Sequence, residues 1–190
     1  MKRVVIKIGS STLVDSGKVD AAFIGSLAAD CAALIKDDEV QPIIVSSGSI
    51  ALGLDILGFG GGERPNDMPT LQAAASVGQV GLIRQYRDTF ALFGVNVGQV
   101  LITRATTGER ESYLHARDTI ERLLELGVVP IINENDTVAV EEIRFGDNDT
   151  LAAMVATSIN ADLVVLLSDI DGLYTADPRR DADAELLETV

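Results

Sequence analysis

Five short apolar segments alternate along the chain with five longer amphipathic or alanine-rich segments. The apolar segments are rich in β-branched residues, as expected of buried strands, and span residues 4–8, 42–46, 95–102, 128–133 and 162–168. The longer segments predict helices at about residues 20–36, 48–57, 70–93, 112–126 and 148–160. This alternation predicts an α/β fold, a three-layer α/β/α sandwich around a mostly parallel central sheet.

In folds of this class, ligands bind beyond the carboxyl ends of the strands, so we expect functional residues at the strand-to-helix turns. Two further segments interrupt the alternation. Residues 57–69 are rich in Gly and Pro and predict either a surface loop near the site or a plain connector. Residues 137–149 alternate apolar and polar residues around a turn, which predicts a small hairpin.

Composition narrows the classes of function. The chain has 190 residues, 47% of them hydrophobic, which is enough for one compact domain. Its formal net charge of −14 argues against nonspecific binding to nucleic acid or to an anionic membrane. The first residues read as a strand rather than a signal peptide, and no apolar run reaches about 18 residues, so we expect a cytoplasmic protein with no membrane partner. Cys31 lies in an apolar helical pattern and is predicted to serve packing.

The first chemical signal is Lys7, a lysine inside an otherwise apolar strand. A buried lysine is costly unless its charge is paired or meets an anion, and phosphate is a natural partner. Gly9 and Ser10 follow directly and offer backbone N–H groups that can approach a phosphate. The alternative is a lysine at a sheet edge whose amine reaches solvent. Neither a GxxxxGK[ST] phosphate loop nor a GxGxxG fingerprint is present in the sequence.

The second and third signals are polar clusters at predicted strand ends. Ser46, Ser47, Gly48 and Ser49 join a strand to a helix, where free N–H groups favour a carboxylate or phosphate; an ordinary serine N-cap is the alternative. The motifs NEND at 133–136 and GDND at 146–149 flank the predicted hairpin. Either motif alone is typical of turns and caps, but the two together indicate a binding site.

The fourth signal is a strand that ends in Ser168 and Asp169 and continues into GLYTADPR. Such a strand end is well placed to contact the sugar, base or phosphates of a nucleotide, although the spacing alone is not specific.

Together, these segments resemble the amino acid kinase family over nearly the whole chain. The motifs that carry the resemblance occur in the family's order: KIGSSTL, SSGSIALG, VGQVLITR, the RDT of HARDT, PIINENDTVA, FGDNDTLAA and SDIDGLYTADPR. NEND, GDND and GLYTADPR are similar to the family members that phosphorylate glutamate, more than to aspartokinase, carbamate kinase or acetylglutamate kinase. The resemblance implies transfer of the γ-phosphoryl group of ATP, with Mg²⁺, to the side-chain carboxylate of L-glutamate, as the first step towards proline.

The resemblance also implies roles for individual residues. Lys7 would act in catalysis, and Asp149 would position the lysines of the site. The residues expected to bind the amino acid are Ser47, Gly48, Asp136 and Asn148. The residues expected to bind the nucleotide are Lys7, Gly9, Ser10, Ser168 and Asp169. No residue is assigned to a metal. The family often has Thr where Ser168 stands, which keeps the hydroxyl group.

Several further expectations follow from the resemblance. Residues 1–190 would form the substrate-binding lobe and the start of the ATP-binding lobe, with a glycine-rich segment, a second lysine and any PUA domain lying beyond Val190. A glutamate carboxylate is already ionised at neutral pH and needs no general base, so His115 is assigned to a helix surface or a subunit contact. We also expect a homo-oligomer, and proline as a feedback inhibitor.

Two alternatives stay open at this point. One is a family member that acts on another carboxylate or on a carbamate. The other is a noncatalytic amino-acid-sensing module, against which the presence of Lys7 and Asp149 argues.

Overall fold

A five-stranded parallel sheet forms the centre of the computed structural model. The structure describes residues 1–15, 17–37, 39–60, 62, 64–103, 110–138, 148–170, 172–181 and 183–187. The strand order is β5-β6-β4-β1-β7, and every pairing in it is parallel. The strands are β1 (Lys2–Ile8), β4 (Val40–Ser46), β5 (Asn96–Ile102), β6 (Val128–Glu134) and β7 (Leu163–Leu167).

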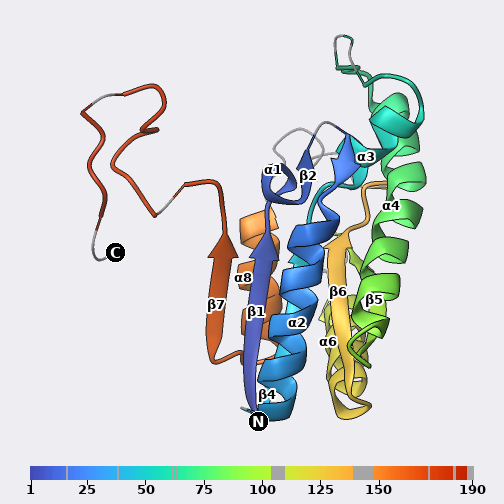
Figure 1. The fold of residues 1–190 in the computed structure, drawn as a ribbon, viewed down its shortest axis with the longest axis vertical. Helices are drawn as coiled ribbons and strands as arrows, with labels where there is room; N and C mark the ends of the chain where they lie inside the picture. The colour runs from blue at the N-terminus through green and yellow to red at the C-terminus, as the bar shows by residue number, and fades with distance from the viewer. Residues whose placement is uncertain are drawn as a thin grey trace.

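Helices cover both faces of this sheet. On one face lie α2 (Ala21–Asp37), α3 (Ser49–Ile56) and α4 (Met68–Ala91), and on the other lie α6 (Arg110–Glu125) and α8 (Asn148–Ser158). Figure 1 shows α2 in front of the sheet and α8 behind it. The predicted three-layer fold, its five strands and its five helices are therefore confirmed.

The structure adds small elements that the sequence pattern did not indicate. They are the single turn α1 (Ser10–Leu13) and a two-stranded antiparallel pair, β2 (Val14–Asp15) and β3 (Lys18–Val19). In the 57–69 segment, Asp67 caps the start of α4 by accepting a hydrogen bond from the Thr70 N–H at 3.0 Å. The predicted hairpin lies largely outside the described residues. No helix within the described ranges has the length and apolarity needed to cross a bilayer.

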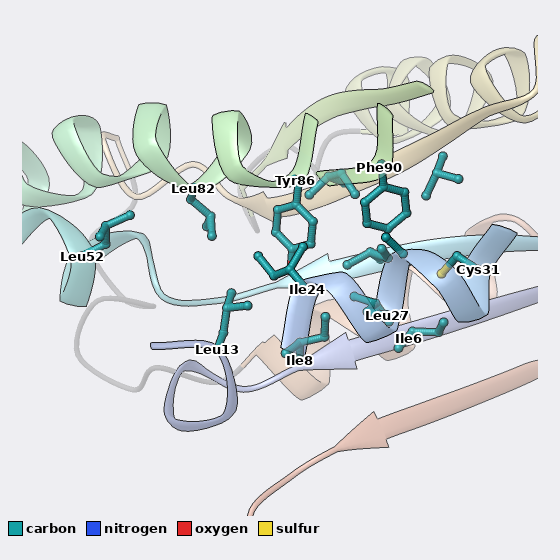
Figure 2. Close-up of a cluster of buried hydrophobic side chains, with 14 residues drawn as sticks. Ile6, Ile8, Leu13, Ile24, Leu27, Cys31, Leu52, Leu82, Tyr86 and Phe90 are labelled. Atoms are coloured by element: carbon teal, nitrogen blue, oxygen red, sulfur yellow. The ribbon is translucent and has the colours of Figure 1, made fainter. Parts of the chain in front are cut away.

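The core is divided into two apolar layers by the sheet. Successive strand residues point to opposite faces, so Ile6 and Ile8 pack towards α2 and α4 while Val5 packs towards α6 and α8. Figure 2 shows Tyr86 and Phe90 of α4 in the first layer, which also holds Cys31. Burial raises the pKa of the Cys31 thiol to about 12, so its predicted packing role is confirmed.

Strand β7 forms one edge of the sheet, and the chain beyond it leaves the body of the molecule. Leu163 and Leu166 of β7 are exposed. The described residues 168–170, 172–181 and 183–187 extend away from the sheet as irregular chain (Figure 1), with one antiparallel bridge between Tyr174 and Leu186.

Helices α3 and α4 pack with their backbones in direct contact at two glycines. A β-carbon added to Gly78 would collide with the carbonyl oxygen of Ser49, and one added to Gly53 would collide with that of Ala74. Because both obstacles are backbone atoms, the helices would have to separate to accept a side chain at either position.

We therefore expect Gly78→Ala to lower the free energy of unfolding by about 2 to 3 kcal/mol, the cost of overpacking a tight contact. The measurement is urea denaturation followed by circular dichroism. Gly25→Ala in α2 is the matched control: open space surrounds Gly25, so alanine there should stabilise the helix by up to about 1 kcal/mol. Equal stabilities for the two variants would contradict the close contact of α3 with α4.

Candidate functional site

The candidate site lies at the carboxyl end of the sheet, where backbone hydrogen bonds join neighbouring strand ends. The Ser47 N–H donates to the Ile8 carbonyl at 3.2 Å, and the Gly9 N–H donates to the Leu167 carbonyl at 3.4 Å. At the other side, the Asn135 N–H donates to the Ile102 carbonyl at 2.8 Å. These bonds tie each of the turns after β1, β4 and β6 to the end of a neighbouring strand, at the edge of the sheet where a parallel fold is expected to bind ligands.

An open pocket of about 160 Å³ lies among these turns. Most of the residues that line it are polar, and the full lining consists of Ser10, Ser47, Gly48, Ser49, Ile50, Ala51, Arg64, Asn133, Glu134, Asp136 and Asn148. Five residues predicted for the amino acid or the nucleotide are thus brought together: Ser10, Ser47, Gly48, Asp136 and Asn148.

Asn148, the first residue of α8, connects the ends of β4 and β6. Its Nδ2 lies 3.0 Å from the Ser46 carbonyl, 2.8 Å from Ser47 Oγ and 3.2 Å from Asn133 Oδ1, so its two N–H groups serve three acceptors. The residue is 8% exposed. Because Ser47 Oγ accepts from Asn148, its own proton is available to a ligand in the pocket.

The turn that begins α3 supplies the facing wall of the pocket. Gly48 adopts a left-handed conformation with φ of 96°, and a β-carbon there would lie 2.9 Å from Val14 Cγ2. Both features favour glycine. Next to it, the Ser49 hydroxyl donates to Asp136 Oδ2 at 3.0 Å, so the helix start and the NEND segment are joined across the pocket.

Lys7 lies beside the pocket and is paired with Asp149. Its Nζ is 2.7 Å from Asp149 Oδ1, and the side chains of Lys7 and Asp149 are 15% and 52% exposed. Lys7 follows Val5 by two residues and therefore points to the α8 face of the sheet. The amine also lies below the Gly9 turn, 3.8 Å from where a β-carbon on Gly9 would be. Lys7 is thus a nearly buried cation next to the turn that follows β1.

Of the five residues predicted for the nucleotide, only Ser10 lines this pocket; Lys7, Gly9, Ser168 and Asp169 do not. Ser168 and Asp169 are exposed at the end of β7, and Asp169 Oδ2 is 2.6 Å from Arg179 Nη2. Within the described residues, no group of three or more His, Cys, Asp or Glu side chains is arranged to hold a metal ion. His115 is exposed on α6, as the helix-surface assignment predicted.

The comparison with protein families decides the affiliation of the chain. The model of the amino acid kinase family matches residues 2–190. The chain belongs to the amino acid kinase family.

Curated relatives within this family are close in sequence. The chain is 50% identical to a glutamate 5-kinase of Myxococcus xanthus, covering 100% of this chain and 49% of the relative. It is 53% identical to a glutamate 5-kinase of Rhodopseudomonas palustris, covering 100% of this chain and 50% of the relative. The chain thus spans about half the length of the curated relatives it matches.

Solved structures show the same fold. A product complex of the isopentenyl phosphate kinase of T. acidophilum aligns with a TM-score of 0.63 at 20% identity, covering 98% of this chain and 78% of the other. A substrate complex of isopentenyl phosphate kinase aligns with a TM-score of 0.60 at 20% identity, covering 97% and 78%. The predicted amino acid kinase-like architecture is therefore confirmed.

Sequence reasoning missed several residues of the site. Arg64 lines the pocket from the Gly- and Pro-rich segment, and its signal was a lone cation in a loop expected near the site. Ser49 was part of a quoted motif without a role of its own. Gln79 contacts Asn133 from the middle of α4, and only the three-dimensional structure reveals that contact.

The ion pair at the end of β7 gives a direct test of this region. The Arg179 guanidinium, by hydrogen bonding and by its charge, lowers the pKa of the Asp169 carboxyl. We expect Arg179→Met to raise that pKa towards the ordinary value of about 3.9, measured by NMR titration of the carboxyl carbon. Arg180→Met is the control, because Arg180 pairs with Asp177 instead. An Asp169 pKa that is the same in all three proteins would show that the ion pair does not form in solution.

Proposed function

We propose that this chain provides the amino-acid site and part of the ATP site of a kinase. The reaction is transfer of the γ-phosphoryl group of ATP to the side-chain carboxylate of L-glutamate, which gives glutamyl 5-phosphate for proline biosynthesis. The observation that carries the proposal is the start of α8, where Asn148 contacts the pocket and the next residue, Asp149, contacts Lys7. The glutamate 5-kinase relatives, about 50% identical over this chain, support glutamate as the acceptor.

The pocket has the groups that an amino acid requires. Asp136 can accept hydrogen bonds from an α-ammonium group, while the Ser47 hydroxyl and the N–H groups after Gly48 can donate to a carboxylate. Arg64 adds a cation to the same lining. A zwitterion with an additional carboxylate matches this mixture of charges. Proline has the same ammonium and carboxylate pair, which supports a proposal that it competes for these groups as a feedback inhibitor.

The reaction requires that the negative charges of the two substrates be stabilised, and it requires no proton transfer. A glutamate carboxylate is ionised at neutral pH, so one of its oxygens can attack the γ-phosphorus directly. The bond from that phosphorus to the β–γ bridging oxygen breaks, and ADP leaves. Lys7 is placed to stabilise the charge of the transferring group, and Asp149 holds its amine in place.

The nucleotide would approach from the Lys7 side of the pocket. The Gly9 N–H already donates to the Leu167 carbonyl, so the N–H groups from Ser10 onward at the start of α1 are the ones proposed to bind phosphate oxygens. Ser168 and Asp169 follow β7, whose last carbonyl bonds to Gly9, and we assign them to the same nucleotide. Mg²⁺ is expected to arrive with ATP, because this ion typically takes substrate phosphates and water as ligands and needs few protein carboxylates.

Lys7→Met, made in the natural full-length protein, should leave the fold intact and lower kcat by about two to four decades, the scale of losing one preorganised electrostatic contact. The measurement is hydroxamate detection of the acyl phosphate with Mg-ATP and glutamate. Lys18→Met provides the control, because Lys18 is an exposed residue of the β2–β3 pair. Near-normal turnover by the Lys7 variant would remove this residue from the mechanism.

The assignment of the two substrates is tested separately. Asp136→Ala and Asn148→Ala should raise the KM for glutamate by about tenfold or more and change the KM for ATP little, since each loses a hydrogen bond to a charged group. Asp88→Ala on the surface of α4 should change neither value. If the main effect is on ATP, the two substrates are placed the wrong way round. If the wild-type protein phosphorylates another acid and not glutamate, the proposed acceptor is wrong.

A further inference from the structure

Helix α4 reaches the candidate site through two polar side chains on its inward face. Gln79 Oε1 lies 2.8 Å from Asn133 Nδ2, and the Tyr86 hydroxyl lies 3.0 Å from Ser46 Oγ. Gln79 and Tyr86 are seven residues apart, which is about two helical turns, so they share one face. Each therefore contacts the last or next-to-last residue of a central strand, behind the pocket lining.

The hydrogen bonds around Asn133 determine which way its amide points. Asn133 Oδ1 accepts from the Glu134 N–H at 2.9 Å and from Asn148 Nδ2 at 3.2 Å. Asn148 Nδ2 is itself identified as the nitrogen because it faces the Ser46 carbonyl, which can only accept. Asn133 Nδ2 must then face Gln79, whose oxygen is its acceptor. A continuous chain of hydrogen bonds thus runs from Gln79 through Asn133 and Asn148 to Ser47.

Stability does not explain why a glutamine stands at this position. Gln79 Nε2 is buried and has no hydrogen-bond partner among the described residues. A buried N–H group without a partner is destabilising, whereas an apolar side chain of similar shape would avoid that cost. The amide at residue 79 is therefore better explained by what its oxygen does for Asn133.

We propose that Gln79 is a positioning residue for the amino-acid pocket. By accepting from Asn133, it fixes the amide that orients Asn148 and, through Asn148, the Ser47 hydroxyl. Gln79 itself does not line the pocket, so its effect on a ligand is indirect. The inference rests on the proposed function for the identity of the ligand, L-glutamate, but the hydrogen-bond chain exists without it.

The first test replaces Gln79 by methionine, which has a similar shape and no amide, in the natural full-length protein. Loss of one orienting hydrogen bond should raise the KM for glutamate about fivefold to tenfold and leave kcat and the KM for ATP within about twofold. The melting temperature should stay within about 3 °C of wild type or rise. Gln85→Met is the matched control, because Gln85 lies on the same helix and, among the residues that the structure describes, its side chain bonds only to Thr89.

The second test is a double-mutant cycle with Asn133→Ala. If Gln79 acts through Asn133, the double variant should have the same KM for glutamate as Asn133→Ala alone. Additive effects would overturn the proposal. So would a Gln79→Met variant that keeps its glutamate KM within twofold of wild type, or one that weakens both substrates equally and also melts at a lower temperature.

A third measurement separates this inference from the proposed function. The side-chain amide signals of Asn148, assigned with Asn148→Ser, are recorded by NMR without any substrate. They should shift in Gln79→Met and not in Gln85→Met. If the wild-type protein fails to phosphorylate glutamate but these signals shift as expected, the proposed function is wrong and the positioning role stands. If the Asn148 signals are the same in both variants, the positioning role is wrong.

Discussion

The charge of Lys7 is the constraint on which the arrangement of the site depends. The side chain of a lysine in the middle of a parallel sheet is removed from water, so its ammonium group must be paired with an anion. Asp149, 2.7 Å away at the start of α8, meets this need while remaining half exposed itself. The pair fixes the first turn of α8 over the end of β1. That position in turn places Asn148 against the end of β4, where the pocket begins.

Helix α4 combines support of the core with support of the site. Leu82 and Phe90 fill the apolar layer against α2, and Tyr86 lies between them on the same face. Burial raises the pKa of the Tyr86 hydroxyl, so it stays protonated. Because the Ser46 hydroxyl donates to the Ser47 carbonyl at 3.2 Å, Tyr86 is the donor to Ser46. A single rigid element thus carries both the packing and the polar contacts behind the pocket.

The sequence predicted those parts of the structure that depend on local pattern. The strands and helices predicted from the hydrophobic pattern match those of the structure. The polar residues after β1, β4 and β6 meet because parallel strands end at one edge of the sheet. The β2–β3 pair was missed, since two-residue strands are too short to show a period. Gln79 was missed for a different reason: its partner Asn133 is 54 residues away in sequence, and one amide in an alanine-rich helix resembles any solvated residue.

Geometry explains why the start of a helix, and not a strand, joins the amino-acid pocket to the region around Lys7. Adjacent residues in a strand point to opposite faces of a sheet, so one of them would face away from the site. Adjacent residues in a helix point about 100° apart. This angle allows Asn148 to contact the end of β4 while Asp149 contacts Lys7 of β1. These two strands are neighbours, about 4.8 Å apart. One turn of helix therefore spans the boundary between the amino acid and the phosphate that it is proposed to receive.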